Sequence, residues 1–557
     1  GSPALRSTPG AKRHSKEKTL ADIKKADRKL KYWGWGYEDA GLDGDQTKAL
    51  LATFADGFGI NPSRDGAFPT LDAIELPKCR LEAPASLEDV CTDDKFERVY
   101  HAFGQSQPDS LRTYAGDFDH APDIVAFPET ERHIAEIYEW AGKTNAAVIP
   151  WGAGSSVVGG VTSDVGSKYN GVISVDMGRM NKVLEVDEVS RAARIQGGAL
   201  GPDLEAQLKP HGLTLRHFPQ SFQHSTFGGW IATRSGGHFA TLYTHIDDLV
   251  EATTTVTPAG DIVSRRLPGS GAGPSPDRFV ALGSEGALGI ITEGWARLQG
   301  RPTYKATAGY RFTDFFDAAR AVRAVSQAGL YPANVRIVDG TELQVNGAGD
   351  GSFTLMVVSF ESADHPVDAW MERAEECCLD HGGTVDVPWR DNPDAHLQGA
   401  VGAWRTAFIR MPYNREQLTP KGIISDTFET AITWDRFEEF YGAIKDATQS
   451  AIRDVTGHDG AVSCRFSHAY PDGPAPYFAF HAPGDPQNML AQWQELKTRA
   501  SDALIKHGGT ITHHHAVGRD HQKWYEQQRP ALFGDVIGDA KKRLDPKGVL
   551  NPGVIVG

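Results

Sequence analysis

Residues 150–160 read PWGAGSSVVGG and follow the apolar run AAVI at 146–149. An apolar run that ends in glycines is typical of a buried strand that enters a turn. The four glycines can adopt positive φ and let a ligand approach the main chain, while Ser155 and Ser156 add hydroxyl donors. Backbone N–H groups gathered in this way form an anion-binding nest. The spacing of the glycines fits neither the G-x-G-x-x-G motif of dinucleotide-binding folds nor the G-x-x-x-x-G-K-[ST] motif of P-loops. The stretch therefore predicts a cradle for a diphosphate, with a simple turn as the alternative.

Length and composition indicate a globular enzyme with more than one domain. The chain has 557 residues, of which 40% are hydrophobic and 23% charged. The formal net charge of −15 argues against nucleic acid as a partner, because binding to phosphates needs an excess of basic residues. The five cysteines are few for this length, and two of them, Cys377 and Cys378, are adjacent. We therefore expect a reduced, cytoplasmic protein.

The sequence also bears on membrane association. It has no run of about 18 apolar residues, so we expect no membrane-spanning segment. The first residues lack the apolar core of a secretory signal, and the final tripeptide is not a peroxisomal one. Residues 12–32 carry a basic excess with weak helical periodicity. They are expected to form a solvated helix, with an arm that contacts an anionic membrane surface as the alternative.

From about residue 120 the chain alternates short apolar runs with turns, which is typical of mixed α/β structure. Two later regions, 301–375 and 436–510, each read strand, helix, strand, which fits a sheet with helices on one face. Helices are expected near 45–57 and at 131–144. Strands are expected within DIVAFPET (123–130), AAVIP (146–150), GVISVDM (171–177), FTLMVVSFE (353–361) and PYFAFHAP (476–483).

Eight motifs support a family resemblance. They are KYWGWGYEDA (31–40), PWGAGSS (150–156), STFGGWIATRSGG (225–237), IDDLVEATTTVTPAG (246–260), ALGSEGALGIITE (281–293), YPANVRIVD (331–339), SDTFETAITWDR (425–436) and THHHAVG (512–518). Together they resemble the alkyl-dihydroxyacetonephosphate synthase family of the vanillyl-alcohol oxidase and para-cresol methylhydroxylase (PCMH) superfamily of flavoproteins. The resemblance runs from about residue 30 to the end. The tryptophan-rich opening and the triple histidine are its narrowest features, whereas the flavin motifs are shared widely.

The resemblance implies an α+β chain with α/β texture. Its parts are a two-subdomain FAD-binding domain of the PCMH type, an α/β cap domain with an antiparallel sheet, and an N-terminal helical extension. The expected boundaries are 1–118 for the helical or irregular extension, 119–300 for the FAD-binding domain, 301–505 for the substrate-binding cap, and 506–557 for a C-terminal segment that returns to the FAD domain with the triple histidine.

The resemblance also implies non-covalently bound FAD. Ser225 and Thr226 suit this role chemically, because hydroxyls can bond flavin ring heteroatoms; taken singly, each motif could also be a simple turn. The pyrophosphate is expected on Pro150, Gly152, Ala153, Gly154, Ser155 and Ser156. The ring and ribityl chain are expected on Gln220, Ser221, Ser225, Thr226, Gly229, Trp230, Ile231 and Ala232. The remaining adenine and flavin shell is expected on Glu285, Gly286, Leu288, Gly289, Ile290 and Ile291.

The family's reaction exchanges the acyl group of acyl-dihydroxyacetonephosphate for a fatty alcohol and forms an ether bond without net redox change. The flavin is expected to act as an electrophile that traps the substrate carbon at N5. Such a site needs a cationic clamp, a proton acceptor and a proton donor. The resemblance assigns the clamp to Arg336, whose fork of donors suits phosphate or carboxylate. The alternative for Arg336 is a surface pair with Asp339.

The resemblance places Tyr477 at the position of the acid/base tyrosine, with a packing tyrosine as the alternative. His513, His514 and His515 are expected to carry protons, because a neutral imidazole near pH 7 suits that task. The alternatives for the histidines are an exposed polar loop or a zinc site, and we expect no metal.

Two further functions remain open. An FAD oxidase or dehydrogenase of a 2-hydroxy acid or alcohol could share this fold, but such enzymes carry a G-E-H-G type motif where this chain has His514-His515-Ala516. The other possibility is a binding protein that keeps the fold but has lost the flavin. The expected partners are a lipid or phosphorylated small molecule, a fatty alcohol, a second copy of the chain in a homodimer, and a membrane surface contacted peripherally.

Overall fold

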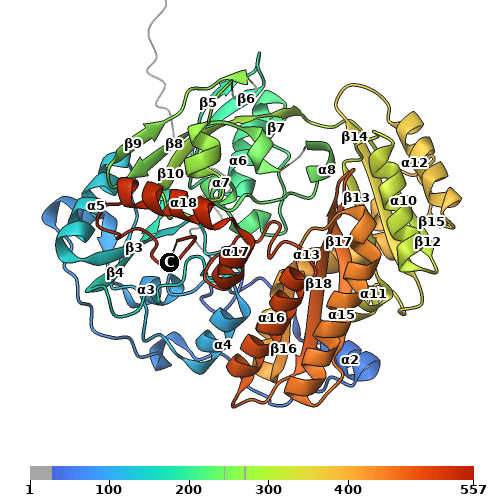
Figure 1. Cartoon of the computed structure of the whole chain (residues 1–557), viewed down its shortest axis with the longest axis horizontal. Helices are drawn as coiled ribbons and strands as arrows, with labels where there is room; N and C mark the ends of the chain where they lie inside the picture. The colour runs from blue at the N-terminus through green and yellow to red at the C-terminus, as the bar shows by residue number, and fades with distance from the viewer. Residues whose placement is uncertain (1–27, 244, 269–270, 557) are drawn as a thin grey trace, which may run out of the picture.

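The chain folds into two lobes, each built around its own β-structure (Figure 1). The computed structural model describes residues 28–243, 245–268 and 271–556. The first lobe holds a four-stranded and a five-stranded sheet, and the second lobe holds a seven-stranded sheet. A short ladder of β11 (Gln299–Gly300) and β7 (Leu213–Thr214) lies at the end of the first lobe's segment of the chain.

The four-stranded sheet explains the glycine-rich turn (residues 150–160). Its order is β1 (Cys91–Thr92), β2 (Ile124–Ala126), β4 (Gly171–Asp176) and β3 (Ala146–Trp151). Both β2 and β3 run parallel to β4, so a helix must cross between β2 and β3. This helix is α5 (Glu131–Thr144), which begins after Thr130, whose hydroxyl accepts the His133 N–H, and buries Ile134 and Ile137. The turn therefore leaves the carboxyl end of a buried parallel strand.

The five-stranded sheet is antiparallel throughout. Its order is β5 (Val183–Asp187), β6 (Ala192–Gln196), β10 (Ile290–Arg297), β8 (Val250–Thr257) and β9 (Gly260–Val263). The apolar side chains of β6 and β10 pack against α6 (Gly201–Leu208) and α7 (Phe227–Thr233). Two short helices follow, α8 (Ala240–Tyr243) and α9 (Ile246–Leu249). This packing brings the start of α7 close to the glycine-rich turn.

The seven-stranded sheet of the second lobe separates a core face from a polar face. Its order is β15 (Thr384–Val387), β12 (Tyr304–Phe312), β14 (Thr354–Ser362), β13 (Asn334–Val338), β17 (Ala461–Ala469), β18 (Pro474–Pro483) and β16 (Ile423–Glu429). On β18, Phe478 and Phe480 enter the hydrophobic core, whereas Tyr477 and Ala479 line a cavity on the other face. This alternation is the period of two that a strand imposes.

Helices cover the core face of this sheet (Figure 1). They are α10 (Phe315–Gln327), α12 (Asp368–Asp380), α15 (Trp434–Thr456) and α16 (Met489–Lys506). The other face is partly covered by α11 (Gly340–Val345) and α13 (Gly399–Arg410), followed in the chain by α14 (Asn414–Leu418). Both expected strand–helix regions thus belong to one sheet. Helices lie on both of its faces, which corrects the expectation of one covered face.

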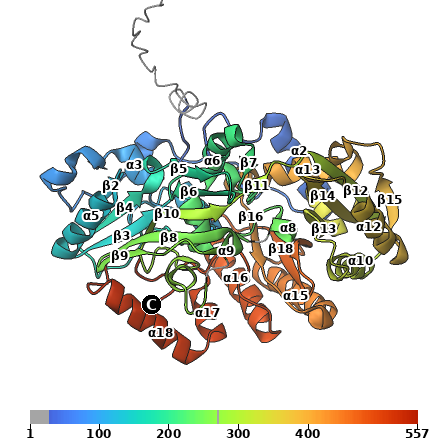
Figure 2. The same ribbon diagram turned by 90° about the horizontal axis from the view of Figure 1, so that it is seen from above.

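Both described ends of the chain cross between the lobes. Helix α2 (Gly44–Phe58) packs against α11 and the second lobe, while α3 (Lys95–Tyr100) and α4 (Gln107–Ala115) follow it. At the other end, α17 (Gln522–Gln528) packs against α16 of the second lobe, and α18 (Ala531–Leu544) returns to the outer side of the first lobe (Figures 1 and 2). There the Val148 N–H donates to the carbonyl of Val549, 2.7 Å away. The last residues therefore extend the sheet that carries the glycine-rich turn.

The α+β architecture and the helices near 45–57 and at 131–144 are confirmed. All five cysteines are free thiols. Most of the basic arm expected at 12–32 lies outside the described residues, and the division into segments at 118, 300 and 505 stays a prediction. Among the helices that the structure describes, none is both long and apolar enough to cross a membrane.

The contact at Gly198 gives a test of the packing in the first lobe. A Cβ added at Gly198 would lie 1.8 Å from the carbonyl oxygen of Met177, so backbone would have to move. We expect Gly198→Ala to lower the free energy of unfolding by about 1–3 kcal/mol, measured by chemical denaturation. Gly44→Ala is the matched control, because no atom lies within 4 Å of the added Cβ. Equal stability of the two variants would contradict this packing.

Candidate active site

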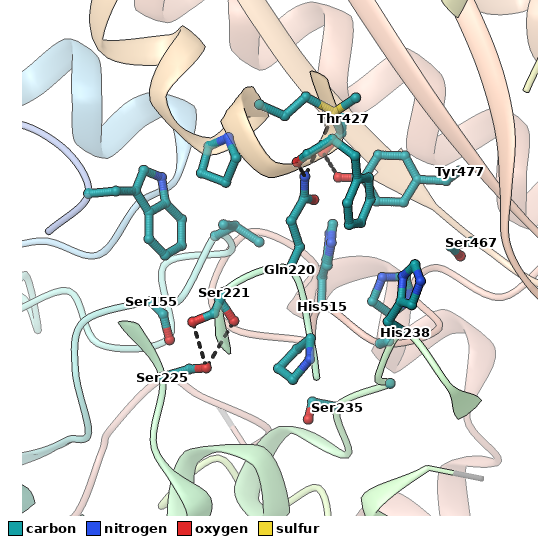
Figure 3. A pocket seen from close by; sticks show the side chains of 18 of the residues that line it. Ser155, Gln220, Ser221, Ser225, Ser235, His238, Thr427, Ser467, Tyr477 and His515 are labelled. Atoms are coloured by element: carbon teal, nitrogen blue, oxygen red, sulfur yellow. Dashed lines mark hydrogen bonds between the residues drawn. The ribbon is translucent and has the colours of Figure 1, made fainter. Parts of the chain in front are cut away.

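A cavity of about 300 Å³ lies between the two lobes and is lined by both (Figure 3). The first lobe contributes the glycine-rich turn and residues 218–238. The second lobe contributes side chains from the polar face of its sheet, together with Phe408 and Met411. Ser155, Ser221 and Ser225 lie on one side of the cavity in Figure 3, and Thr427 and Tyr477 lie on the other.

The glycine-rich turn presents bare backbone to this cavity. Within the described chain, the N–H groups of Ala153–Ser156 donate no hydrogen bond. Gly154 has φ 69°, and a Cβ there would lie 2.3 Å from the Trp151 ring, so the turn needs glycine at this position. The Ser156 hydroxyl accepts the Gly160 N–H at 2.9 Å and thereby fixes the end of the turn. Free amides on a fixed backbone form the nest that the sequence predicts.

The start of α7 faces this turn. The Thr226 hydroxyl caps the helix by accepting the Gly229 N–H at 3.2 Å, and a Cβ added at Gly152 would lie 2.4 Å from that same oxygen. The Trp230 indole N–H donates to the Ser225 hydroxyl at 2.7 Å. The two segments therefore approach each other with only small residues and hydroxyls between them.

Two buried arginines lie on the opposite wall. Arg336 on β13 is 5% exposed, and Arg465 on β17 is 2% exposed. Arg465 is paired with Glu342 and lies 3.9 Å from the centre of the Tyr477 ring. Arg336 donates through Nε to the Asn334 side chain, but its Nη atoms donate to no group that the structure describes. Burial, together with the charge of Arg465, lowers the pKa of Arg336 to about 9, so it stays charged at neutral pH.

The histidine segment (residues 512–518) crosses between the lobes beside the cavity. A single carboxylate, that of Glu429 at the end of β16, accepts hydrogen bonds from the backbone N–H groups of His513, His514 and His515 at 2.7–3.2 Å. It also accepts from the Thr512 hydroxyl at 2.6 Å. Burial acts to raise the pKa of Glu429, but the neighbouring histidines lower it well below its usual range. A permanent carboxylate therefore fixes the backbone of all three histidines.

Burial keeps two imidazoles of this segment neutral, those of His513 and His515. Burial, followed by the charge of His514, lowers the pKa of His513 well below its usual value and that of His515 to about 3. The His514 Nδ1 lies 3.2 Å from Glu429. The rings of His515 and Tyr477 meet edge to face at 5.3 Å, and the Tyr477 hydroxyl donates to Thr427 at 3.1 Å. Burial raises the pKa of Tyr477, which keeps its proton available for donation.

The structure brings most of the expected site residues to the cavity wall, but not all. Pro150, Ile231, Ala232 and His513 lie behind the wall, as do all six expected residues of the 285–291 stretch. That stretch supports the site from outside, since Glu285 accepts the Val517 and Gly518 N–H groups at 2.7 Å. The residues at the wall are Gly152, Ala153, Gly154, Ser155, Ser156, Gln220, Ser221, Ser225, Thr226, Gly229, Trp230, Arg336, Tyr477, His514 and His515.

Sequence reasoning missed several lining residues, above all Arg465 and His468. It also missed Glu429, which lies behind the wall and fixes the histidines. A signal for Arg465 exists, because the run AVSCRF (461–466) alternates and Arg465 stands between the buried Cys464 and Phe466. The expected pair of Arg336 with Asp339 does not form, since Asp339 pairs with Lys445. Ring nitrogens of His468, His513 and His514 lie within 4.8 Å of one another, a spacing that a metal could use, so the absence of a metal stays a prediction.

These residues fit the FAD that the resemblance implies. The unpaired amides of Ala153–Ser156 suit a pyrophosphate. Gly152 lies so close to the Thr226 hydroxyl that a larger side chain would clash there. The hydroxyls of Ser221, Ser225 and Thr226 can meet the polar edge of a ring. Residues 152–156 would hold the diphosphate, and the 221–230 stretch would hold the ring.

Comparison with known proteins agrees with this fit. Residues 122–265 match the FAD binding domain family, and residues 301–555 match the C-terminal domain of FAD linked oxidases. An alkyldihydroxyacetonephosphate synthase of Dictyostelium discoideum is 32% identical, over 84% of this chain and 78% of the relative. A solved alkyldihydroxyacetonephosphate synthase structure has a TM-score of 0.78 at 26% identity and covers 94% of this chain and 98% of its own. p-Cresol methylhydroxylase shares the fold, with a TM-score of 0.66 at 13% identity over 92% of this chain and 98% of its own. The chain therefore has the PCMH-type fold and uses FAD as its cofactor.

The Glu429 carboxylate gives a test of how the histidines are held. Glu429→Gln keeps the size but replaces one acceptor oxygen by a donor that faces backbone N–H groups. We expect it to lower the free energy of unfolding by about 3 kcal/mol, as loss of a buried charged acceptor does. Glu438→Gln removes a carboxylate that is 57% exposed and should change stability little. Identical denaturation curves for both variants would contradict the role given to Glu429.

Buried histidines make the stability depend on pH. Burial lowers the pKa values of His217, His481 and His521 to about 3–4, so the unfolded chain binds more protons below about pH 6.5. Their contribution is complete above that pH and is lost on acidification. Burial raises the pKa values of Glu285 and Asp520 to about 7, which gives a smaller contribution of opposite sign, lost as the pH rises. We expect the free energy of unfolding to fall by at least about 1 kcal/mol from pH 7 to pH 5. A rise over this interval, measured by urea denaturation, would contradict the assignment.

Proposed function

The chain belongs to the alkyldihydroxyacetonephosphate synthase family, and from this premise we propose that it exchanges the acyl group of acyl-dihydroxyacetonephosphate for a fatty alcohol. The product is an ether lipid precursor. One observation carries the proposal: an unpaired buried guanidinium and the imidazoles of His514 and His515 face a cradle of free amides across one cavity. The amide cradle thus suits the diphosphate of the cofactor, and the guanidinium on the opposite wall suits the anionic end of the substrate.

Arg336 and Arg465 suit the phosphate of the substrate. Their two positive charges face only one paired carboxylate, that of Glu342, which leaves an excess of positive charge in a buried place. A buried cation without a partner is costly, and a phosphate that accepts from both guanidinium forks removes that cost. Fixing the phosphate here also fixes the reacting carbon with respect to the rest of the cavity.

Apolar side chains on the same cavity suit the chains of the acyl group and the alcohol. Trp35, Phe218, Phe408 and Met411 lie on the wall. Phe408 contacts the Arg336 guanidinium face at 4.7 Å, so the apolar surface begins directly beside the charged one. A molecule with a phosphate head and an alkyl tail matches a cavity wall on which a charged surface is followed directly by an apolar one.

The remaining side chains can move protons. Bound FAD supplies the electrophilic ring that makes the exchange possible. The imidazoles of His514 and His515 reach the cavity, where a ring nitrogen without a proton can accept one from the substrate carbon or from the alcohol. Tyr477 retains its proton and can donate a hydrogen bond to the departing carboxylate. Acceptor and donor therefore lie side by side, as an exchange without net redox change requires.

We also keep two finer predictions. One is a homodimer, and the other is a peripheral contact with a membrane at the basic excess of residues 12–32.

The proposal is tested by mixing the FAD-loaded protein anaerobically with acyl-dihydroxyacetonephosphate and then with hexadecanol. We expect a reversible change in the flavin spectrum on the first addition and ether product after the second. Full reduction of the flavin by a 2-hydroxy acid, without ether product from the lipid pair, would instead favour an oxidoreductase.

Arg336 is the side chain whose replacement tests the phosphate clamp. Arg336→Met is expected to raise KM for the acyl substrate by about tenfold to 100-fold, because a charge-assisted contact is lost. The KM for the fatty alcohol should change little. Arg453→Met provides the control, since that arginine is 58% exposed and pairs with Asp459 on the surface. An unchanged KM for the acyl substrate in Arg336→Met would exclude the clamp.

A further inference from the structure

Four side chains form a continuous hydrogen-bonded line from the cavity toward the outside. His514 lines the cavity, and its Nδ1 lies 3.1 Å from Nδ1 of His513. The other ring nitrogen of His513, Nε2, lies 2.9 Å from the Tyr470 hydroxyl, which is in turn hydrogen-bonded to Nε2 of His245. We propose that this line is a proton relay, which carries the proton released in each turnover from His514 to His245 and out of the site.

The relay rests on the proposed function, and the balance of that reaction requires an exit for a proton. The bond from the substrate carbon to the acyl oxygen breaks, and a bond from that carbon to the alcohol oxygen forms. The alcohol loses its hydroxyl proton, and the fatty acid leaves as a carboxylate, because carboxylic acids have pKa values of about 4. One proton is therefore left over per turnover. No electrons are gained or lost, so no further reactant is needed.

The geometry allows the proton to pass in one direction without rotation of any ring. An imidazole can take up a proton at one nitrogen while it gives one up at the other, and a phenol hydroxyl can do the same at its oxygen. A proton that enters His513 at Nδ1 displaces the one at Nε2 toward Tyr470. Tyr470 then passes its own proton to His245.

The backbone on both sides holds this geometry. The His513 N–H donates to Glu429 at 2.7 Å, and the Tyr470 carbonyl accepts the Trp434 indole N–H at 3.0 Å. Tyr470 lies in the hairpin between β17 and β18, where its N–H donates to the Gly473 carbonyl. Neither relay member therefore depends on a free loop for its position.

The surroundings favour passage over storage of the proton. Burial, followed by the charge of His514, lowers the pKa of His513 well below its usual value and that of His245 to about 4. His245 is only half-buried in the chain, and the exposed Asp248 on α9 lies close enough to act on its pKa. The titratable and charged groups around the relay are His468, His515, Glu429, Asp247, Asp248, Asp472 and Arg234.

Tyr470→Phe is the first test, because it removes one oxygen from the relay and leaves the ring in place. We expect ether product to form with kcat lowered at least about tenfold, an unchanged KM, and a larger solvent deuterium isotope effect. Tyr441→Phe is the matched control, since that hydroxyl contacts Asp339 and Lys445 away from the cavity. Full turnover with an unchanged isotope effect in Tyr470→Phe would overturn the relay.

His245→Ala provides a second variant that keeps the proposal testable if the first fails to fold. Added imidazole should restore its turnover, because a free base can replace the missing relay member; failure of rescue in a folded variant would overturn the relay. If the wild-type protein makes no ether product, the proposed function fails instead.

Two readouts do not depend on turnover. Nitrogen-labelled histidine NMR of the protein without substrate should show altered tautomers of His513 and His245 in Tyr470→Phe, and identical spectra would contradict the hydrogen-bonded line. Stoichiometric zinc in the purified protein would also contradict it, since a metal on His513 and His514 would displace the proton between their facing Nδ1 atoms.

Discussion

Two carboxylates, one from each lobe, hold the histidine segment in place. Glu429 of the second lobe accepts the N–H groups of residues 513–515, and Glu285 of the first lobe accepts those of residues 517 and 518. Five N–H groups of this segment are thus bound by two acids, one at the end of β16 and one in the turn that precedes β10. Since the cavity lies between the same lobes, the positions of its histidines depend on both lobes being correctly docked.

This constraint explains how a site can be assembled from distant parts of the sequence. The amide cradle follows a parallel strand near residue 150, the guanidinium groups stand on antiparallel strands near 336 and 465, and the imidazoles come from a C-terminal segment that crosses back. The two lobes contribute different chemical groups: the first contributes free amides, and the second contributes two guanidinium groups and a phenol. The crossing segment then supplies the imidazoles between them.

The sequence allowed the fold class, the glycine-rich turn and the family to be predicted, because these depend on local patterns and narrow motifs. Ala146–Trp151 and Glu131–Thr144 follow directly from apolar runs and a capping threonine. Glu429, Arg465 and Tyr470 could not be assigned in this way, since their roles depend on which strands are neighbours. The stretch 285–291 matched a flavin motif, yet it lies behind the wall, because its glutamate bonds backbone rather than facing the cavity.

A crystal structure of the FAD-loaded protein with dihydroxyacetone phosphate would test the central claim most directly. The account predicts the diphosphate on the amides of residues 152–156, the substrate phosphate between Arg336 and Arg465, and the flavin ring between them, within reach of His514 and Tyr477. A substrate phosphate bound away from both arginines, or a ring on the far side of the histidine segment, would contradict it.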